Sequence, residues 1–271
     1  MEYALIKSTI APLMEAPPRE NEITDEALCG MTVKVLERNG AWVHIRTHYR
    51  YEGWVHEQNL CFDRDLVQIW TAAPKKVVLQ AYADVLGAPK VQGHFIGEIA
   101  RGGLLSPLDE VQDGWQKVRF CDGREGWTWG AFLGEYITTW DKKDEPALRK
   151  ALVNTALGYF GTQYRWGGKT PLGIDCSGLC SMAYLLNGVI IHRDAHILPE
   201  FDMHEIAFAD KKAGDLLFFP GHVAMYLGDN RYIHSTAGNN CHGVVINSLD
   251  PKAADYRADL PEKLLCTGSI F

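Results

Sequence analysis

The sequence Tyr164-Arg-Trp-Gly-Gly-Lys-Thr-Pro-Leu-Gly-Ile-Asp-Cys-Ser-Gly-Leu-Cys180 contains a glycine-rich loop that ends in the cysteine Cys176. Apolar residues then recur at helical spacing as far as Asn187-Gly188, which predicts a helix that begins at or near Cys176. Either Asp175 or Ser177 can cap this helix. Because unpaired N–H groups and the positive end of the dipole favour a thiolate at a helix N-terminus, we expect a reactive cysteine here.

Two histidines downstream could activate this cysteine. His222 lies in the strand-like run 221–228, and His234 lies in a second such run, 231–238, after the turn Gly228-Asp229-Asn230. Adjacent antiparallel strands would bring the two imidazoles side by side. We therefore assign Cys176 as nucleophile, His222 as its base and His234 as the residue that orients the base.

Two other interpretations of these residues remain open. A cysteine before a helix is often a small core residue, as we expect for Cys180, and a histidine in a strand is often structural. A zinc site could use Cys176, His222, His234 and His204, but the sequence has neither Cys-x-x-Cys nor His-x-x-x-His spacing there. We expect no metal and no other cofactor.

Composition limits the class of protein. A chain of 271 residues exceeds one typical domain, and its 46% hydrophobic content supports packed cores. A formal charge of −7 argues against a nucleic-acid partner. Seven cysteines without framework spacing, no signal-peptide pattern and no apolar run of about 20 residues predict a cytoplasmic protein without membrane association. Nothing in the sequence indicates the oligomeric state.

The first half of the chain contains a degenerate repeat. Residues 39–60 and 113–133 share Gly and Trp, then Val or Ile before Arg, then Glu-Gly-Trp, and Leu six residues later. Upstream, residues 11–17 mirror residues 83–89. Alternating apolar residues between closely spaced turns predict two small β-barrels, at 1–68 and 69–138. We expect four tryptophans to lie in the barrel cores: Trp42, Trp54, Trp115 and Trp127.

The second half is expected to form an α+β domain over residues 139–271. Polarity rises around the linker Asp141-Lys-Lys-Asp-Glu145, where Asp144 can cap a helix that ends by Gly161. The buried stripe of that helix would be Leu148, Ala151, Leu152, Thr155, Ala156 and Tyr159. Short strands at 216–219, in the two histidine runs and at 243–246 would complete a small antiparallel sheet.

These motifs resemble known families. The repeated skeleton is similar to the bacterial SH3 domain. Asp-Cys-Ser-Gly at 175–178, Gly-Asp-Leu-Leu-Phe-Phe at 214–219, Gly-His-Val-Ala-Met-Tyr-Leu-Gly at 221–228 and Tyr-Ile-His-Ser at 232–235 resemble the NlpC-type cysteine peptidases. The resemblance implies a multidomain chain with two all-β SH3-like barrels followed by an α+β papain-like catalytic domain. It also implies hydrolysis of the bond between γ-D-glutamate and a diamino acid.

Within that group, the chain looks like the two-barrel endopeptidases that recycle murein peptides. The implied substrate is L-Ala-γ-D-Glu-diamino acid with a free N-terminal L-Ala; whether the diamino acid is diaminopimelate or lysine stays open. A non-catalytic adaptor that binds cell-wall peptides is the main alternative. Another thiol amidase or acyltransferase is also compatible, because related folds support several such reactions.

The resemblance assigns further residues to the site. Tyr164 would donate its hydroxyl to the oxyanion together with the backbone N–H of Cys176. The residues implied to line the substrate subsite are Trp166, Asp175, Ser177 and Asp194, with Tyr51 and Glu15 from the first barrel. Carboxylates among them would bind the free ammonium of L-Ala. For Tyr51 and Glu15, chance variation of exposed loop residues is the alternative, because the second repeat has Arg124 and Gly87 there.

Overall fold

The computed structural model describes residues 2–17, 21–141 and 144–271. Lys142 and Lys143 of the expected linker lie outside the described residues. The chain forms two compact units, Met1–Tyr136 and Ile137–Phe271. None of the described helices has the length and apolar character that a membrane crossing requires.

Unit 1 begins with a seven-stranded antiparallel sheet. Its strands are β1 (Glu2–Ile6), β2 (Ile10–Met14), β3 (Ile23–Leu28), β4 (Thr32–Asn39), β5 (Trp42–Arg46), β6 (Glu52–His56) and β7 (Leu60–Cys61), with the short 3-10 helix η1 (Glu57–Asn59) before β7. The strand order is β3-β2-β6-β5-β4-β1-β7. Inward residues of different strands, such as Ala11, Val33 and Val55, are fully buried, as alternation predicts for a small barrel.

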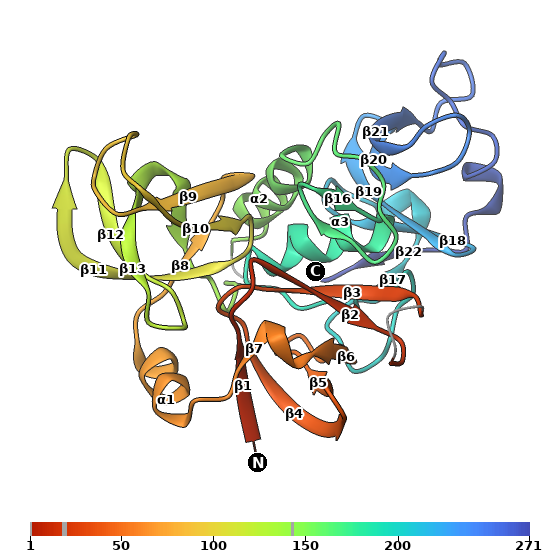
Figure 1. Cartoon of the computed structure of the whole chain (residues 1–271). Helices are drawn as coiled ribbons and strands as arrows, with labels where there is room; N and C mark the ends of the chain where they lie inside the picture. Colours follow the sequence, from red (N-terminus) through yellow and green to blue (C-terminus); the bar gives the residue numbers. More distant parts are fainter. Residues whose placement is uncertain (1, 18–20, 142–143) are drawn as a thin grey trace. The chain divides into compact units, whose positions relative to one another are not determined.

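A second seven-stranded sheet repeats this order strand for strand. It contains β8 (Lys76–Val78), β9 (Tyr82–Leu86), β10 (Phe95–Ala100), β11 (Leu104–Gln112), β12 (Trp115–Arg119), β13 (Glu125–Trp129) and β14 (Leu133–Glu135), with η2 (Gly130–Phe132) before β14. Its order is β10-β9-β13-β12-β11-β8-β14. The shared order indicates that the sequence repeat corresponds to a structural repeat (Figure 1).

A helix that the sequence analysis did not predict connects the two sheets. It is α1 (Arg64–Ala72), capped by the Asp63 carboxylate, and the boundary expected after residue 68 falls inside it. The indole N–H of Trp70 donates to the Gly30 carbonyl at 2.8 Å, and Leu104 N–H donates to the Cys29 carbonyl at 2.9 Å. These contacts join the two sheets within unit 1.

The prediction that the four repeat tryptophans form the barrel cores is wrong. Trp42, Trp54, Trp115 and Trp127 are all only partly buried. Their strands alternate so that the neighbouring small and β-branched residues face inward instead. Trp70 of α1 is the buried tryptophan of this unit.

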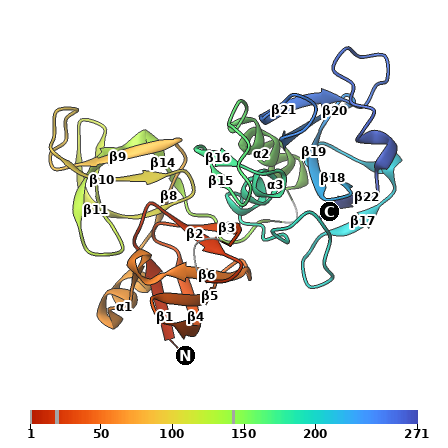
Figure 2. The same ribbon diagram turned by 45° about the vertical axis from the view of Figure 1, so that its right-hand side comes forward.

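Unit 2 combines two helices with an antiparallel sheet. The helices are α2 (Glu145–Leu157) and α3 (Cys176–Leu185), and the main-sheet strands are β17 (His204–Ile206), β18 (Leu216–Phe219), β19 (His222–Gly228), β20 (Arg231–Thr236), β21 (Gly243–Ser248) and β22 (Cys266–Ser269). The order is β17-β22-β18-β19-β20-β21, so the expected final strand at 243–246 is followed by one more. The loop before α3 contains the small pair β15 (Lys169–Thr170) and β16 (Gly173–Ile174), beside α3 in Figure 2.

The two helices differ in how they pack. Asp144 caps α2 as predicted, accepting from Ala147 N–H, and the helix ends at Leu157. Its buried residues come from the predicted stripe, whereas residues 176–184 of α3 are buried on every side. α3 packs against α2 and against strands β19 and β20 of the sheet. A helix buried all round holds its N-terminal residue firmly in place.

Candidate active site

Cys176 is the first residue of α3, and the chain enters the helix in extended conformation at Asp175. The Asp175 carboxylate accepts a hydrogen bond from Gly178 N–H at 2.5 Å, which is the predicted N-cap. The Cys176 side chain is 7% exposed. The helix therefore places a nearly buried thiol at its N-terminus.

Burial changes the acidity that we expected for this thiol. It raises the pKa of Cys176 to about 11, and the negative charge of Asp175 adds to the effect. The backbone N–H groups of Val223 and Ser177 act in the opposite direction, as expected at a helix N-terminus, but they are outweighed. The resting group is therefore a neutral thiol that needs a base at the moment of attack.

The two histidines are neighbours, as predicted from the strand pairing. β19 and β20 pair antiparallel, and His222 Nε2 lies 2.7 Å from His234 Nδ1. A third residue, missed by the sequence analysis, continues the chain: His234 Nε2 lies 2.9 Å from Asn247 Oδ1 on β21. Asn247 Nδ2 in turn donates to the Asp255 carbonyl at 2.8 Å.

This chain of hydrogen bonds determines both tautomers. The Asp255 carbonyl can only accept, so the amide nitrogen of Asn247 must face it and Oδ1 must face His234. His234 then carries its proton on Nε2 and accepts at Nδ1, which requires a proton on His222 Nε2. The lone pair left on His222 is at Nδ1. That nitrogen is the acceptor available to a thiol proton.

Both imidazoles are held neutral. Burial lowers the pKa of His222 to about 3, with His234 and Arg257 adding to the effect, and burial lowers the pKa of His234 to about 4. The Val223 N–H that faces the Cys176 sulfur belongs to the residue after His222, so the thiol lies at the start of β19. α3 also packs against β19. A neutral acceptor thus lies on the strand that faces the thiol.

Tyr164 lies in the loop before α3, and its backbone pairs with Ile174. Burial, followed by the charges of Cys176 and Asp175, raises the pKa of its phenol far above the usual range. The hydroxyl therefore stays protonated beside the thiol and can donate a hydrogen bond. This is the property that the predicted oxyanion role requires.

Arg193 is a second residue that the sequence analysis missed. Its two terminal nitrogens donate to the two carboxylate oxygens of Asp175, each at 3.0 Å, and one also donates to Ser177 Oγ at 2.7 Å. Asp175 also accepts from Gly167 N–H at 2.8 Å, so its carboxylate is surrounded by donors. The run His192-Arg-Asp contained the signal, but only its aspartate was singled out. In the structure, Asp175 and Ser177 organise the loop around the nucleophile.

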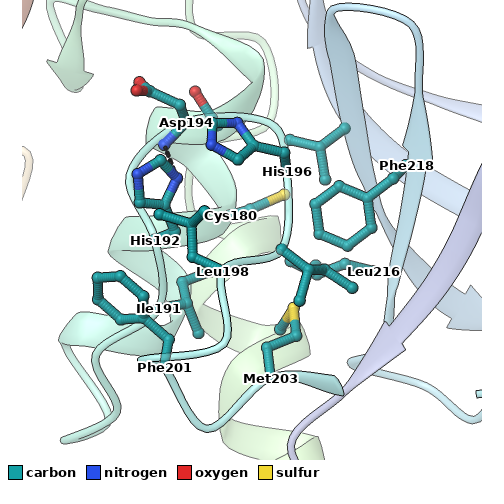
Figure 3. A pocket seen from close by; sticks show the side chains of 13 residues that line it. Cys180, Ile191, His192, Asp194, His196, Leu198, Phe201, Met203, Leu216 and Phe218 are labelled. Carbon is teal, nitrogen blue, oxygen red and sulfur yellow. Dashed lines mark hydrogen bonds between the residues drawn. The ribbon is translucent and has the colours of Figure 1, made fainter. Parts of the chain in front are cut away.

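A small pocket in unit 2 borders the residues that follow Cys176 and His222 in the chain (Figure 3). Ser177 and Val223 line it, as do Cys180, His192 and the predicted subsite residue Asp194. Its volume is about 10 Å³, the lower limit for one water molecule. The backbone N–H of Asp194 donates to His192 Nδ1 at 3.3 Å, and the Asp194 carboxylate points away from the apolar side chains in Figure 3. The carboxylate is therefore directed outward.

The remaining predicted residues lie in different surroundings. Trp166, in the loop before α3, is 60% exposed. Glu15 and Tyr51 belong to unit 1, where Glu15 is exposed and the Tyr51 hydroxyl donates to the Thr24 carbonyl at 3.4 Å. In the described parts of the chain, no group of three or more His, Cys, Asp or Glu could hold a metal ion.

Comparison with known proteins places this site in a family context. Residues 161–258 match the NlpC/P60 family, and residues 13–60 match the bacterial dipeptidyl-peptidase Sh3 domain. The first match contains Cys176, His222 and His234. No family match to residues of the second sheet accompanies them, although its strand order is the same.

Relatives match most of the chain. A dipeptidyl-peptidase 6 from Lysinibacillus sphaericus is 42% identical, covering 99% of both chains. A γ-D-glutamyl-L-lysine dipeptidyl-peptidase from Bacillus subtilis is 35% identical over 80% of this chain and 73% of its own length. The crystal structure of an NlpC/P60 family protein from Bacillus cereus superposes with a TM-score of 0.80 at 22% identity, covering 98% of both chains, which shows a shared fold.

Proposed function

Because the chain belongs to the NlpC/P60 family, we propose that it is a cysteine endopeptidase that cleaves γ-D-glutamyl–diamino acid bonds in murein peptides. The observation that carries this proposal is the hydrogen-bonded series His222–His234–Asn247 beside a thiol at a helix N-terminus. The name of the Bacillus subtilis relative, a γ-D-glutamyl-L-lysine dipeptidyl-peptidase, supports the bond that is cleaved.

In this mechanism Cys176, His222 and His234 are the catalytic group. His222 Nδ1 takes the thiol proton as the sulfur attacks the γ-carbonyl carbon of D-glutamate, so no thiolate is needed in the resting state. The oxyanion accepts hydrogen bonds from the Tyr164 hydroxyl and the Cys176 N–H, each worth about 2.7–4 kcal/mol in hydrolases. Collapse of this intermediate breaks the C–N bond, and His222 returns the proton to the departing amine.

Water completes the cycle. His222 Nδ1 accepts a proton from the water molecule as its oxygen attacks the thioester carbonyl. The C–S bond then breaks, the sulfur regains the proton, and L-Ala-γ-D-Glu leaves with a new carboxylate. The hydrogen bond from His234 Nε2 to Asn247 supports this step, because it keeps the acceptor lone pair of His222 at Nδ1.

We further propose a free N-terminal L-Ala as the recognised group. Tyr51, Glu15, Trp166, Asp194 and Ser177 remain its proposed subsite together with Asp175. Arg193 already neutralises Asp175, so the carboxylates left to pair with an ammonium are Asp194 and Glu15. A substrate whose L-Ala is amide-linked would leave them unpaired, which disfavours binding.

The domain scheme that we propose has three parts: a first bacterial SH3-like barrel at 1–68, a second at 69–138 and a peptidase domain at 139–271. The repeated strand order supports the second barrel. We also propose a cytoplasmic location. All seven cysteines are free, which supports a reducing compartment.

The test uses L-Ala-γ-D-Glu-diaminopimelate and product analysis by mass spectrometry. Cys176→Ala should lower kcat/KM at least ~10⁴-fold, as removal of a nucleophile does in other hydrolases. Cys241→Ala, which removes a partly exposed thiol, is the matched control and should retain activity. Activity in Cys176→Ala would exclude this site as the catalytic centre.

The N-terminal requirement needs its own comparison. Acetylating the L-Ala amine of the same substrate should reduce kcat/KM by about 10²-fold or more, since the carboxylates of the subsite then lack their ammonium partner. Equal cleavage of both forms would disprove the recognition of a free L-Ala while leaving the peptidase assignment intact.

A further inference from the structure

The second barrel of unit 1 contains a hollow that the peptidase mechanism does not use. Its volume is about 700 Å³, within the range of small-ligand sites. Four aromatic side chains line it, together with one carboxylate, that of Asp84. The aromatic residues are Tyr82, Trp115, Trp129 and Phe132. They come from β9, β12, β13 and η2, and β13 pairs with both β9 and β12 (Figure 1).

The two tryptophans form a corner. Trp115 and Trp129 are cross-strand partners, with ring centroids 5.8 Å apart and planes at 82°. Trp129 is 39% exposed, so much of its ring surface is open to solvent. Aromatic faces carry negative electrostatic potential, and a corner of two such faces favours a cation over an anion.

The carboxylate of Asp84 adds to this negative potential. Asp84 is exposed and lies opposite Glu98 in the antiparallel pair of β9 and β10, which places two like charges across from each other. Among the residues that the structure describes, neither carboxylate forms an ion pair. A cation bound at Asp84 would relieve this arrangement.

The first barrel provides an internal control for these residues. By strand register, Trp42 corresponds to Trp115 and His56 corresponds to Trp129. The rings of Trp42 and His56 are likewise nearly perpendicular, with centroids 5.4 Å apart and planes at 83°. The other lining positions differ. By register and strand position, Tyr82, Asp84 and Phe132 correspond to Ile10, Pro12 and Asn59. The perpendicular ring pair is therefore common to both barrels, whereas the added aromatic rings and the carboxylate belong to the second barrel.

We propose that this hollow binds the primary ammonium group of a lysine-like side chain. The ammonium would lie against the rings of Trp115 and Trp129 and donate hydrogen bonds to Asp84, while its alkyl chain covers apolar ring surface. A carboxylate with free lone pairs favours a primary ammonium, which has N–H donors, over a quaternary one. The residues that line this hollow belong to unit 1 and include none that the peptidase mechanism uses, so this proposal does not depend on that mechanism.

Nuclear magnetic resonance of the ¹⁵N-labelled full-length chain can test the proposal. The indole signals of Trp115 and Trp129 are assigned with Trp115→Phe and Trp129→His, the latter being the residue of the first barrel. The probe is Nα-acetyl-L-lysine methylamide, and its norleucine counterpart is the uncharged control. The lysine probe should shift both indole signals with millimolar affinity and bind about tenfold more tightly than norleucine.

Two variants measure how much the Asp84 carboxylate contributes to binding of the lysine probe. Asp84→Asn should weaken the lysine probe about three- to tenfold, whereas Asp109→Asn, an exposed aspartate of the same barrel outside the hollow, should not change it. The proposal is overturned if the indole signals do not shift at roughly 50 mM lysine probe. It is also overturned if the norleucine probe binds as tightly as the lysine probe, or if Asp84→Asn binds the lysine probe as tightly as the unchanged chain does.

Free L-lysine, as a further arm, distinguishes the source of the ammonium. Tighter binding of the blocked probe assigns the hollow to lysine-like residues within peptides, and tighter binding of free lysine assigns it to the amino acid. Repeating the titration with Cys176→Ala separates this result from the peptidase assignment. Binding should be unchanged in that variant, because Cys176 does not line the hollow.

Discussion

Two arginine–carboxylate pairs in this molecule are each joined by two hydrogen bonds but have very different surroundings. In unit 2, Arg193 meets Asp175 through two bonds of 3.0 Å, and the side chains are 2% and 9% exposed. In unit 1, Arg119 meets Glu125 through bonds of 2.8 and 2.6 Å, with side chains 39% and 36% exposed. Distances alone would rank the exposed pair as the stronger. Burial reverses that order, because an unpaired charge in the interior has no water to replace its partner.

The largest effect is expected at the buried pair. Arg193→Met should lower the free energy of unfolding by about 3–5 kcal/mol, because it leaves the Asp175 carboxylate buried without its counter-charge. Urea unfolding at neutral pH measures this difference. A loss below 1 kcal/mol would show that burial is not what separates the two pairs.

The hydrogen-bonded series His222–His234–Asn247 should show a smaller effect, on the reaction rate rather than on stability. Asn247→Ala removes the acceptor that fixes the His234 tautomer, and should lower kcat about 10- to 100-fold with little change in KM. Asn187→Ala is the matched control, since the Asn187 amide also makes two hydrogen bonds in unit 2 but is not part of this hydrogen-bonded series. Equal kcat values for the two variants would mean that Asn247 has no special role in positioning the histidines.

The two buried imidazoles predict a pH dependence of stability. Their pKa values are lowered from 6.5 to about 3 for His222 and about 4 for His234, so the unfolded chain binds more protons below pH 6.5. Stability should therefore fall as the pH is lowered from 6.5 towards 4, by about 1–2 kcal/mol per imidazole at pH 5.

Urea unfolding at pH 7 and pH 5 measures this dependence. His234→Asn should reduce the difference in the free energy of unfolding between pH 7 and pH 5 by the contribution of one imidazole, because asparagine takes up no proton. An unchanged difference in this variant would mean that His234 is protonated in the folded chain.

The smallest effect is expected at the exposed pair. Arg119→Met should change the free energy of unfolding by only about 0–1 kcal/mol, because water solvates Glu125 when its partner is removed. The same urea titration used for Arg193→Met provides the measurement. A loss of 3 kcal/mol or more here would remove the contrast between the two surroundings.

The sequence anticipated the main elements of the site because their signals are local. Asp175 precedes an apolar helical run and has a side chain that can cap it, and it does so. The turn at 228–230 connects two short strands, and their pairing brings His222 and His234 within 2.7 Å. The repeat in the first half likewise predicted two sheets, which share one strand order.

Other features depend on contacts between distant segments. The local sequence around Asn247 carries no signal for the site, and Arg193 was passed over in favour of its neighbour Asp194. Only folding brings Asn247 to His234 and Arg193 to Asp175. The four repeat tryptophans were assigned to the cores by their size, yet strand alternation keeps them near the surface. The helix α1 was missed because no repeated pattern includes it.

The sequence by itself determined the positions of the nucleophile and the two imidazoles, because helix caps, turns and strand alternation act over a few residues. Only the tertiary structure decided the protonation states of these groups. The helix N-terminus favours a thiolate at Cys176, but burial outweighs it and raises the pKa to about 11. Desolvation depends on everything packed around a group, and that surrounding exists only once the chain has folded.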